Sequence, residues 1–145
     1  MRAFKFRLQR LLRLSHRREE ALRKDWALAM QAREEHKLRT QRMQRARADA
    51  EELGNSLSPA SSMAIAYEQN LIRKLRAMEG ERILIQERVD ESHAAWQEAR
   101  MALKQIEKLE EIERLRHETQ IARQEQQELE ELAELGRRAK AGRRF

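Results

Sequence analysis

Histidine and carboxylate are the side chains in this sequence that could bind a metal ion or transfer protons. The four histidines, His16, His36, His93 and His117, lie far apart, and none has a second histidine three or four positions away. Glu113 and His117 could share a helix face, but two ligands do not make a zinc site. The sequence contains no cysteine, which excludes a thiolate site, a cysteine nucleophile and a disulfide framework. We therefore expect no metal site.

Catalysis by paired carboxylates requires a concave, desolvated setting that separates their pKa values. The glutamates between Glu107 and Glu134 instead follow one another along a polar helix, where they are most simply a solvated face. The sequence also lacks a phosphate-binding glycine loop, a Walker motif and a Gly-x-Ser-x-Gly motif. We expect no catalytic residue, no cofactor and no enzymatic activity.

The basic segment from Arg2 to Arg18 is the one feature that could bind nucleic acid. Lysine and arginine at helical spacing are all that nonspecific phosphate binding requires. The sequence has no zinc-finger, basic-zipper or RNA-binding motif that would give base specificity. A basic helix face that meets acidic proteins is the favoured interpretation, with a nucleic-acid-binding coiled coil as the alternative.

The composition indicates the elements that position these side chains. Charged residues make up 39% of the chain and aromatics 4%, with four glycines and one proline, which is typical of long helices and coiled coils. Apolar residues reach 40% and recur at helical spacing, which argues against disorder. No secretory signal and no apolar run of about 18 residues is present. The sequence predicts a soluble, cytoplasmic protein.

Charge is segregated along the chain. Residues 1–47 contain far more lysine and arginine than acidic residues, whereas residues 107–135 are predominantly acidic. The last ten residues are basic again, with Arg137, Arg138, Lys140, Arg143 and Arg144. Such segregation concerns the choice of partner and not the fold.

The segment from Gly54 to Pro59 contains the only proline and the densest cluster of helix-breaking residues. Gly54 is suited to end a helix, Ser58 to cap the next one and Pro59 to occupy its first turn. We therefore expect helix one at about 4–53, a turn at 54–58, helix two at about 59–135 and a basic tail at 136–145.

Both expected helices carry a heptad repeat of apolar residues. In helix one a template from Leu8 selects Leu8, Leu11, Leu22, Ala29, Ala32, Met43, Ala46, Ala50, Leu53 and Leu57. In helix two the repeat selects Ala64, Leu71, Leu75, Met78, Ile85, Val89, Trp96, Ala99, Leu103 and Ile106. The positions of the repeat form the seam along which the two helices should pack. Trp26 and Tyr67 lie beside this seam, and His36 lies on it as a tolerated polar residue. The prediction is an all-α, single-domain antiparallel coiled-coil hairpin over residues 1–145.

Helix two is the longer of the two and should overhang its partner. A turn near residue 56 would place Phe4 close to Lys108, which leaves residues from about 109 to 135 unpaired. This stretch is still amphipathic, with Ile112, Leu115, Ile121, Ala122, Leu129, Leu132 and Leu135. An apolar stripe with no partner in the same chain predicts an external one.

Several stretches resemble a known family. Phe4-Lys5-Phe6-Arg7-Leu8, continuing to Leu14, resembles the opening Phe-x-Phe-x-Leu pattern of the FliJ family of bacterial flagellar type III export. Tyr67 with Leu71 and Leu75, and then Trp96 with Ala99, resemble the start and middle of that family's second helix. The stretches 106–111 and 125–133 resemble its Leu-Glu-Lys-Leu and Glu-Gln-x-x-Leu-Asp-Glu-x-Ala signatures.

The resemblance implies a cytoplasmic stalk, peripheral at the inner membrane, that binds inside the hexameric export ATPase and links it to the export gate. Export chaperones are further implied partners, and the membrane is reached only through the gate. The ring-binding surface is predicted at Phe4, Phe6, Arg7, Arg10, Arg13, Ile112, Leu115, Leu129, Leu132, Arg137, Arg138, Arg143 and Arg144. The gate-binding surface is predicted at Tyr67, Asn70, Leu71 and Lys74. A virulence type III secretion stalk, a nucleic-acid-binding coiled coil and a homodimeric scaffold stay open as alternatives.

Overall fold

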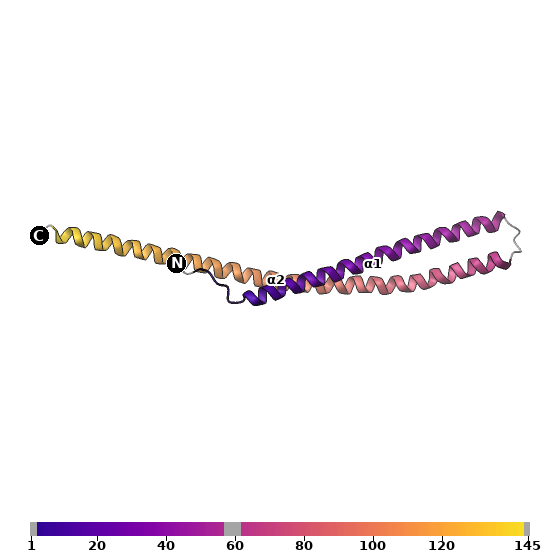
Figure 1. Cartoon of the computed structure of the whole chain (residues 1–145), viewed down its shortest axis with the longest axis horizontal. Helices are drawn as coiled ribbons and strands as arrows, with labels where there is room; N and C mark the ends of the chain where they lie inside the picture. The colour runs from indigo at the N-terminus through magenta and orange to yellow at the C-terminus, as the bar shows by residue number, and fades with distance from the viewer. Residues whose placement is uncertain (1–2, 57–61, 144–145) are drawn as a thin grey trace. The chain divides into compact units, whose positions relative to one another are not determined.

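The computed structural model describes residues 3–56 and 62–143. It contains two helices, α1 (Gln9–Ser56, 48 residues) and α2 (Ser62–Gly142, 81 residues), and no strand in the described ranges (Figure 1). The all-α prediction and the greater length of the second helix are confirmed.

The chain divides into two compact units, to which both helices contribute. We call Arg17–Arg100 the hairpin unit, and Met1–His16 together with Met101–Phe145 the terminal unit. Each of them has its own packing.

Contacts within the hairpin unit show that α1 and α2 run antiparallel in one chain. Trp26 stacks on Trp96, Arg33 donates a hydrogen bond to Gln86 at 3.4 Å, and His36 lies 3.6 Å from Glu81, beyond hydrogen-bond reach. Residue numbers rise along α1 as they fall along α2, which is the order of an antiparallel pair. In this unit the two helices lie side by side in Figure 1, so the hairpin prediction is confirmed for the described residues.

The heptad phase of α2 is as the sequence predicts. Leu71, Val89 and Ala99 are buried, and Leu75 and Trp96 between them are half-buried. These residues belong to one heptad register, in which steps of three and four residues alternate, and this keeps one stripe of the helix against its partner. The same alternation continues past Ile106, to the half-buried Glu110, Glu113 and His117.

Some of the residues of α1 that face inward are those that the heptad template predicts, and others are not. Leu8, Leu22, Ala29, His36 and Met43 face inward, as the template expects. Ala46 and Ala50 are half-buried, also as the template expects. Other inward positions lie four residues, and not three, after the predicted positions at 8, 15, 22, 29, 36 and 43. They are Leu12, Glu19, Trp26, Arg33, Thr40 and Arg47, whereas Leu11, Arg18, Asp25, Ala32, Arg39 and Leu53 of the template are exposed.

The first residues of the described chain are not helical. Helix α1 begins at Gln9 rather than near residue 4, and Gln9 N–H donates to the Phe6 carbonyl at 3.2 Å. Residues 3–6 have no regular secondary structure, and Arg7 and Leu8 form a turn that leads into the helix. In this conformation Phe4, Phe6 and Leu8 all pack in the core that Leu12 and Leu103 also form.

The terminal unit has a small core that this segment completes. Phe6, Leu12 and Leu103 are buried together, and Phe4, Leu8 and Ile106 pack against them. A non-helical residue can span up to about 3.3 Å, against 1.5 Å in a helix. Phe4 reaches His117 and Arg114, further along α2 than the expected Lys108.

The helix ends near the turn differ from the prediction. Helix α1 continues through Gly54 to Ser56, and no described glycine has a positive φ angle, so Gly54 does not end the helix. Ser58 and Pro59, with Leu57 of the predicted seam, lie outside the described residues. Helix α2 begins at Ser62 and continues to Gly142, so most of the predicted basic tail is helical.

Candidate functional site

The aromatic residues predicted to bind the ring, Phe4 and Phe6, pack against α2. Phe6 is 8% exposed. The Phe4 ring lies 5.6 Å from the imidazole of His117, and the Arg114 guanidinium lies 5.6 Å from the Phe4 ring. Arg114 is itself held by Glu110 at 2.8 Å. Aromatic and cation–π contacts of this kind stabilise by about 0.5 to 1.5 kcal/mol each.

The basic residues of the same segment point to solvent. Arg7, Arg10 and Arg13 are exposed, and none forms an ion pair with a described residue. Arg10 and Arg13 lie three positions apart in α1, on neighbouring parts of one side of the helix, and Arg7 lies in the turn that precedes it. His16 ends this stretch and lies 3.5 Å from Glu107. The N-terminal segment and the start of α1 thus present three arginines that are available to an acidic partner.

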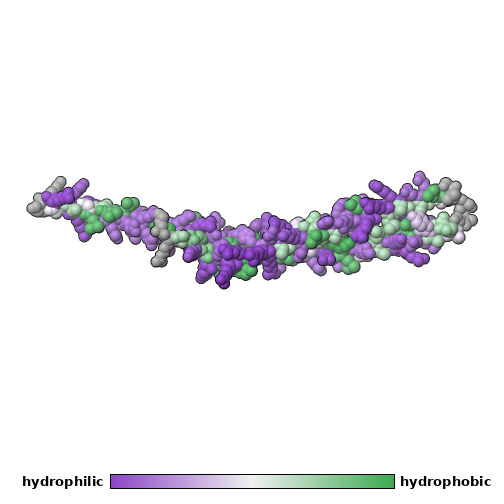
Figure 2. Space-filling model, viewed as in Figure 1, coloured by the Kyte–Doolittle hydropathy of each residue, from purple (hydrophilic) through white to green (hydrophobic). Residues whose placement is uncertain are grey.

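The overhanging part of α2 carries an apolar stripe that nothing in the described chain covers. Every residue from 122 to 143 is exposed, and Figure 2 shows hydrophobic surface among the polar atoms of this part of α2. The exposed fractions are 42% for Ile112, 56% for Leu115, 67% for Leu129, 64% for Leu132 and 59% for Leu135.

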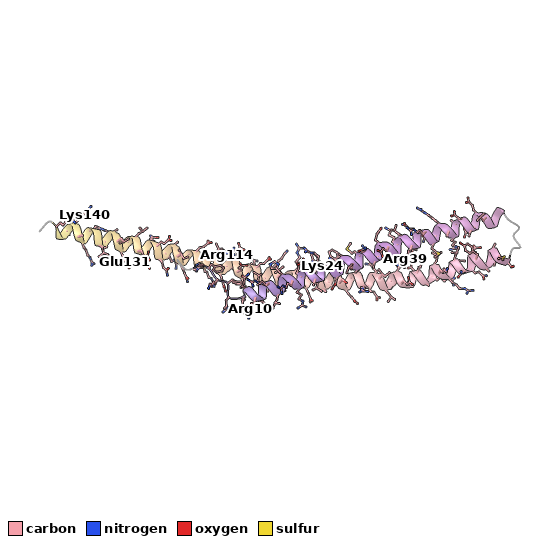
Figure 3. The ribbon with its side chains drawn as sticks, in the orientation of Figure 1. Arg10, Lys24, Arg39, Arg114, Glu131 and Lys140 are labelled. Atoms are coloured by element: carbon pink, nitrogen blue, oxygen red, sulfur yellow. The ribbon has the colours of Figure 1, made fainter. Side chains whose placement is uncertain are left out.

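The basic end of α2 adjoins this stripe. Arg137, Arg138 and Arg143 are exposed, and Arg138 donates to Glu134 at 2.7 Å. Arg144 lies outside the described residues. The labelled side chains of Glu131 and Lys140 project from the same part of the helix (Figure 3). The terminal unit therefore contains the described basic and apolar residues of the prediction, with Phe6 in its core and the two groups of arginines at different levels of α2.

The residues predicted to bind the gate separate into exposed and buried ones. Tyr67 is 52% exposed, Asn70 and Lys74 are exposed, and Leu71 is only 4% exposed. Their spacing of three and four residues places the three exposed side chains on one face of α2. Leu71 packs in the seam of the hairpin unit, so it can support this surface but does not form it.

An aromatic cluster in the hairpin unit was not predicted. The rings of Trp26 and Trp96 stack at 5.0 Å and 19°, and His93 lies 4.7 Å from Trp26. Trp96 Nε1 donates to Glu19 Oε1 at 2.9 Å, and the Arg100 guanidinium lies 5.2 Å from the Trp96 ring. The sequence prediction placed Trp26 beside the seam because its phase for α1 was wrong. Recognising Trp26 as a seam residue would have revealed the cluster.

His36 is the buried polar residue of the hairpin seam, at 3% exposure. Its carbonyl accepts a hydrogen bond from Thr40 Oγ1 at 2.9 Å.

Two residues before Glu81 on α2, Glu79 accepts hydrogen bonds from the guanidinium of Arg82. This contact lowers the pKa of Glu79 and raises that of Arg82. Both side chains are exposed, so the pair belongs to the surface of α2 and not to the seam.

The described residues contain no group of three histidine or acidic side chains placed to hold a metal ion. A groove of about 470 Å³ in the hairpin unit is lined by Asp25, Leu28, Ala29, Ala32, Ile85, Arg88 and Ser92. Asp25 is its only carboxylate, so the groove lacks the paired acids that general acid–base catalysis would use.

Comparison with known proteins identifies the family. The family model described as the flagellar FliJ protein matches residues 4–142, which is nearly the whole chain. No curated protein and no solved structure shows a significant match. Neither helix, over the residues described, contains a stretch long and apolar enough to cross a membrane. With its helical hairpin, the chain belongs to the flagellar FliJ family, a family of non-enzymatic coiled-coil stalk proteins of flagellar type III export.

Proposed function

We propose that this chain is the stalk of the flagellar export ATPase, binding inside the hexameric ring through its terminal unit and contacting the export gate through the start of α2. It acts in the cytoplasm at the inner membrane, which it meets only through the gate, and it also engages export chaperones. The observation that carries the proposal is the terminal unit, which contains both exposed arginines and an uncovered apolar stripe on α2.

A ring that surrounds a helix requires contacts on more than one side of it. The N-terminal segment contributes Arg7, and the first turns of α1 contribute Arg10 and Arg13. The overhang of α2 contributes leucines and a second set of arginines. Arginine suits such contacts because its planar guanidinium binds carboxylates in a bidentate manner. Both surfaces belong to a single unit, which supports their use by one partner.

Replacing Arg7, Arg10 and Arg13 together with alanine should weaken binding to the export ATPase roughly 3- to 100-fold. The range follows from about 0.2 to 1 kcal/mol for each exposed ion pair. Helicity should be unchanged because the three side chains make no ion pair with described residues. Titration of the purified ring with the variant, followed by fluorescence anisotropy at two salt concentrations, measures the loss.

The matched control is the triple alanine variant of Arg39, Arg42 and Arg45, three exposed arginines of α1 in the hairpin unit. It removes the same charge and should leave ring affinity close to that of the unaltered chain. Equal weakening by both variants would mean that net charge alone matters, and the assignment to the terminal unit would then be wrong.

The gate-binding surface is proposed at Tyr67, Asn70 and Lys74. These exposed side chains share one face in the first turns of α2. Tyrosine is enriched among residues that dominate protein interfaces, since its ring buries a large area and its hydroxyl can still form a hydrogen bond.

Tyr67→Ala should weaken binding to the cytoplasmic domain of the gate by about 1 to 2 kcal/mol, or roughly 5- to 30-fold. Half of its surface is exposed, so the fold should tolerate the change. Isothermal titration with the isolated gate domain measures the affinity. Ile83→Ala is the control, because Ile83 lies on the same helix with a similar exposed fraction of 49%. Unaltered gate affinity in Tyr67→Ala would move the site elsewhere.

A further inference from the structure

In the hairpin unit, α2 carries an apolar patch that the described chain does not cover. Ile83 and Leu84 are 49% and 66% exposed. Gly80 lies about one turn before them and Ala77 about two turns before them, and both are exposed. At about 100° per residue, all four lie within about 60° of the direction of Gly80, so they share one face of the helix. We call this surface the Gly80 face.

The Gly80 face points away from α1. Leu71 and Val89, which are buried in the seam, lie nine residues before and nine residues after Gly80, or about 180° around the helix from it. The exposed residues of the proposed gate-binding surface lie about 80 to 140° from Gly80, so that surface is a different one. The proposed ring-binding surface belongs to the terminal unit. The Gly80 face is therefore free for another partner.

Gly80 has no part in the packing of its own chain. Its φ angle is not positive, and a Cβ atom added there would meet nothing within 4 Å. Glycine in the interior of a helix lowers its stability relative to alanine. Because glycine has no side chain, it lets a second backbone approach closely. The centre of the Gly80 face is therefore suited to contact with another helix.

Two charges of opposite sign lie on the same face, at equal distances from Gly80. Arg73 precedes Gly80 by seven residues and Glu87 follows it by seven, so each lies within about 20° of the direction of Gly80. Both side chains are exposed, and neither forms an ion pair with another described residue. The Gly80 face thus has a base toward its N-terminal end and an acid toward its C-terminal end, with the apolar patch between them.

We propose that the Gly80 face pairs with the same face of a second copy of the chain, antiparallel, about a two-fold axis at Gly80. Residues equally far before and after Gly80 then lie at the same level of the two helices. This places Arg73 of one chain opposite the partner's Glu87, and Glu87 opposite the partner's Arg73. Every contact occurs twice, as an isologous interface requires.

Both edges of the contact are filled in the same arrangement. On one edge Leu84 lies within one residue of the level of the partner's Ala77, so it packs over a small side chain. On the other edge Ile83 lies within one residue of the level of the partner's Arg76, whose methylene groups cover it. Arg76 is also about one turn from the level of the partner's Glu87, which gives that carboxylate a second cation.

Charge selects the antiparallel arrangement over the parallel one. Two parallel copies in register would bring Arg73 against Arg73 and Glu87 against Glu87, and like charges across an interface weaken it. The antiparallel pair instead forms two ion pairs, one on each side of the axis. The short interface and the exposed ion pairs imply a weak dimer, with a Kd on the order of 100 µM.

Charge exchange tests this pairing in the full chain. Arg73→Glu leaves only acids at the paired positions, and Glu87→Arg leaves only bases. Sedimentation equilibrium from about 10 µM to 1 mM should show reversible dimers for the unaltered chain and a Kd that is roughly fivefold higher or more for either variant alone. An equimolar mixture of the two variants should form mixed dimers about as tightly as the unaltered chain, because every acid then faces a base.

The matched controls are Arg45→Glu and Glu34→Arg, which make the same two changes of net charge at exposed positions of α1. Both should dimerise like the unaltered chain, and circular dichroism should show equal helicity in all variants. An unaltered chain that stays monomeric throughout the range would overturn the proposal. Dimers that persist in both variants of the Gly80 face, a mixture that stays monomeric, or controls that weaken the dimer equally would overturn it as well. Binding to the ATPase and to the gate takes no part in these measurements.

Discussion

Removal of residues 122–145 should abolish binding to the export ATPase and its stimulation, while the remaining chain stays folded. The segment includes Leu129, Leu132, Leu135 and the basic end of α2, which are half of the proposed ring-binding surface. Its described residues, 122–143, are all exposed, so their removal uncovers little apolar area elsewhere. We expect a change of less than about 0.5 kcal/mol in the free energy of unfolding.

The deletion begins after Ile121 so that the anchor of the N-terminal segment is retained. Phe4 keeps its contacts with Arg114 and His117, and the core of Phe6, Leu12 and Leu103 is untouched. Thermal unfolding followed by the fluorescence of Trp26 and Trp96 reports on the hairpin unit without interference from the missing helix. A truncated chain that still binds and stimulates the ring would show that the overhang is not part of the ring-binding surface.

Trp96→Ala should give the largest loss of stability among single substitutions in the hairpin unit. Trp96 stacks on Trp26, packs near His93 and Arg100 and donates its N–H to Glu19. Truncation of a buried tryptophan costs about 3 to 5 kcal/mol, and partial exposure reduces this to about 2 to 3 kcal/mol. The midpoint of thermal unfolding should fall by about 5 to 10 °C.

Two milder variants separate the contributions of ring and hydrogen bond. Trp96→Phe retains an aromatic ring against Trp26 and loses the N–H donor, so it should cost about 1 kcal/mol. Glu19→Gln retains a side-chain oxygen acceptor for the Trp96 N–H and should cost less than Trp96→Phe. Differential scanning calorimetry of the three variants gives the comparison. A Trp96→Ala variant as stable as the unaltered chain would mean that the cluster does not hold the helices together.

The register of α2 in the hairpin unit could be read from the sequence because most of its inward positions are apolar. Leu71, Leu75, Val89 and Ala99 belong to one register of alternating steps of three and four residues. The hairpin followed from the single cluster of breakers between two such stripes. These features depend on local periodicity, which needs no knowledge of the partner.

The register of α1 could not be read in the same way, because two stripes compete. The stripe chosen from the sequence contains more apolar residues, including Leu11, Ala32 and Leu53. The structure instead turns Glu19 and Arg33 inward, where their polar groups bond to Trp96 and Gln86 on α2. Long charged side chains can pack their methylene groups in a seam while their ends find partners. Counting apolar residues misses this compensation.

The candidate sites divide along the same line. The basic and apolar character of the chain's ends, and the exposed position of Tyr67 on α2, were evident from residue types and spacing. Whether Phe4 and Phe6 would be surface or core residues was not, since an aromatic pair two positions apart suits either an exposed helix or an extended segment packed on a neighbour.

By itself the sequence therefore determined two long helices, their antiparallel return within one chain and the amphipathic face of α2, because helical periodicity and chain breakers are local properties. Only the tertiary structure decided that Trp26 stacks on Trp96, that Phe6 is buried against Leu103, and that Phe4 reaches His117. Each of these contacts depends on which side chain of α2 lies opposite the residue concerned. Residues some 70 to more than 110 positions apart in the chain carry no local signal of their pairing.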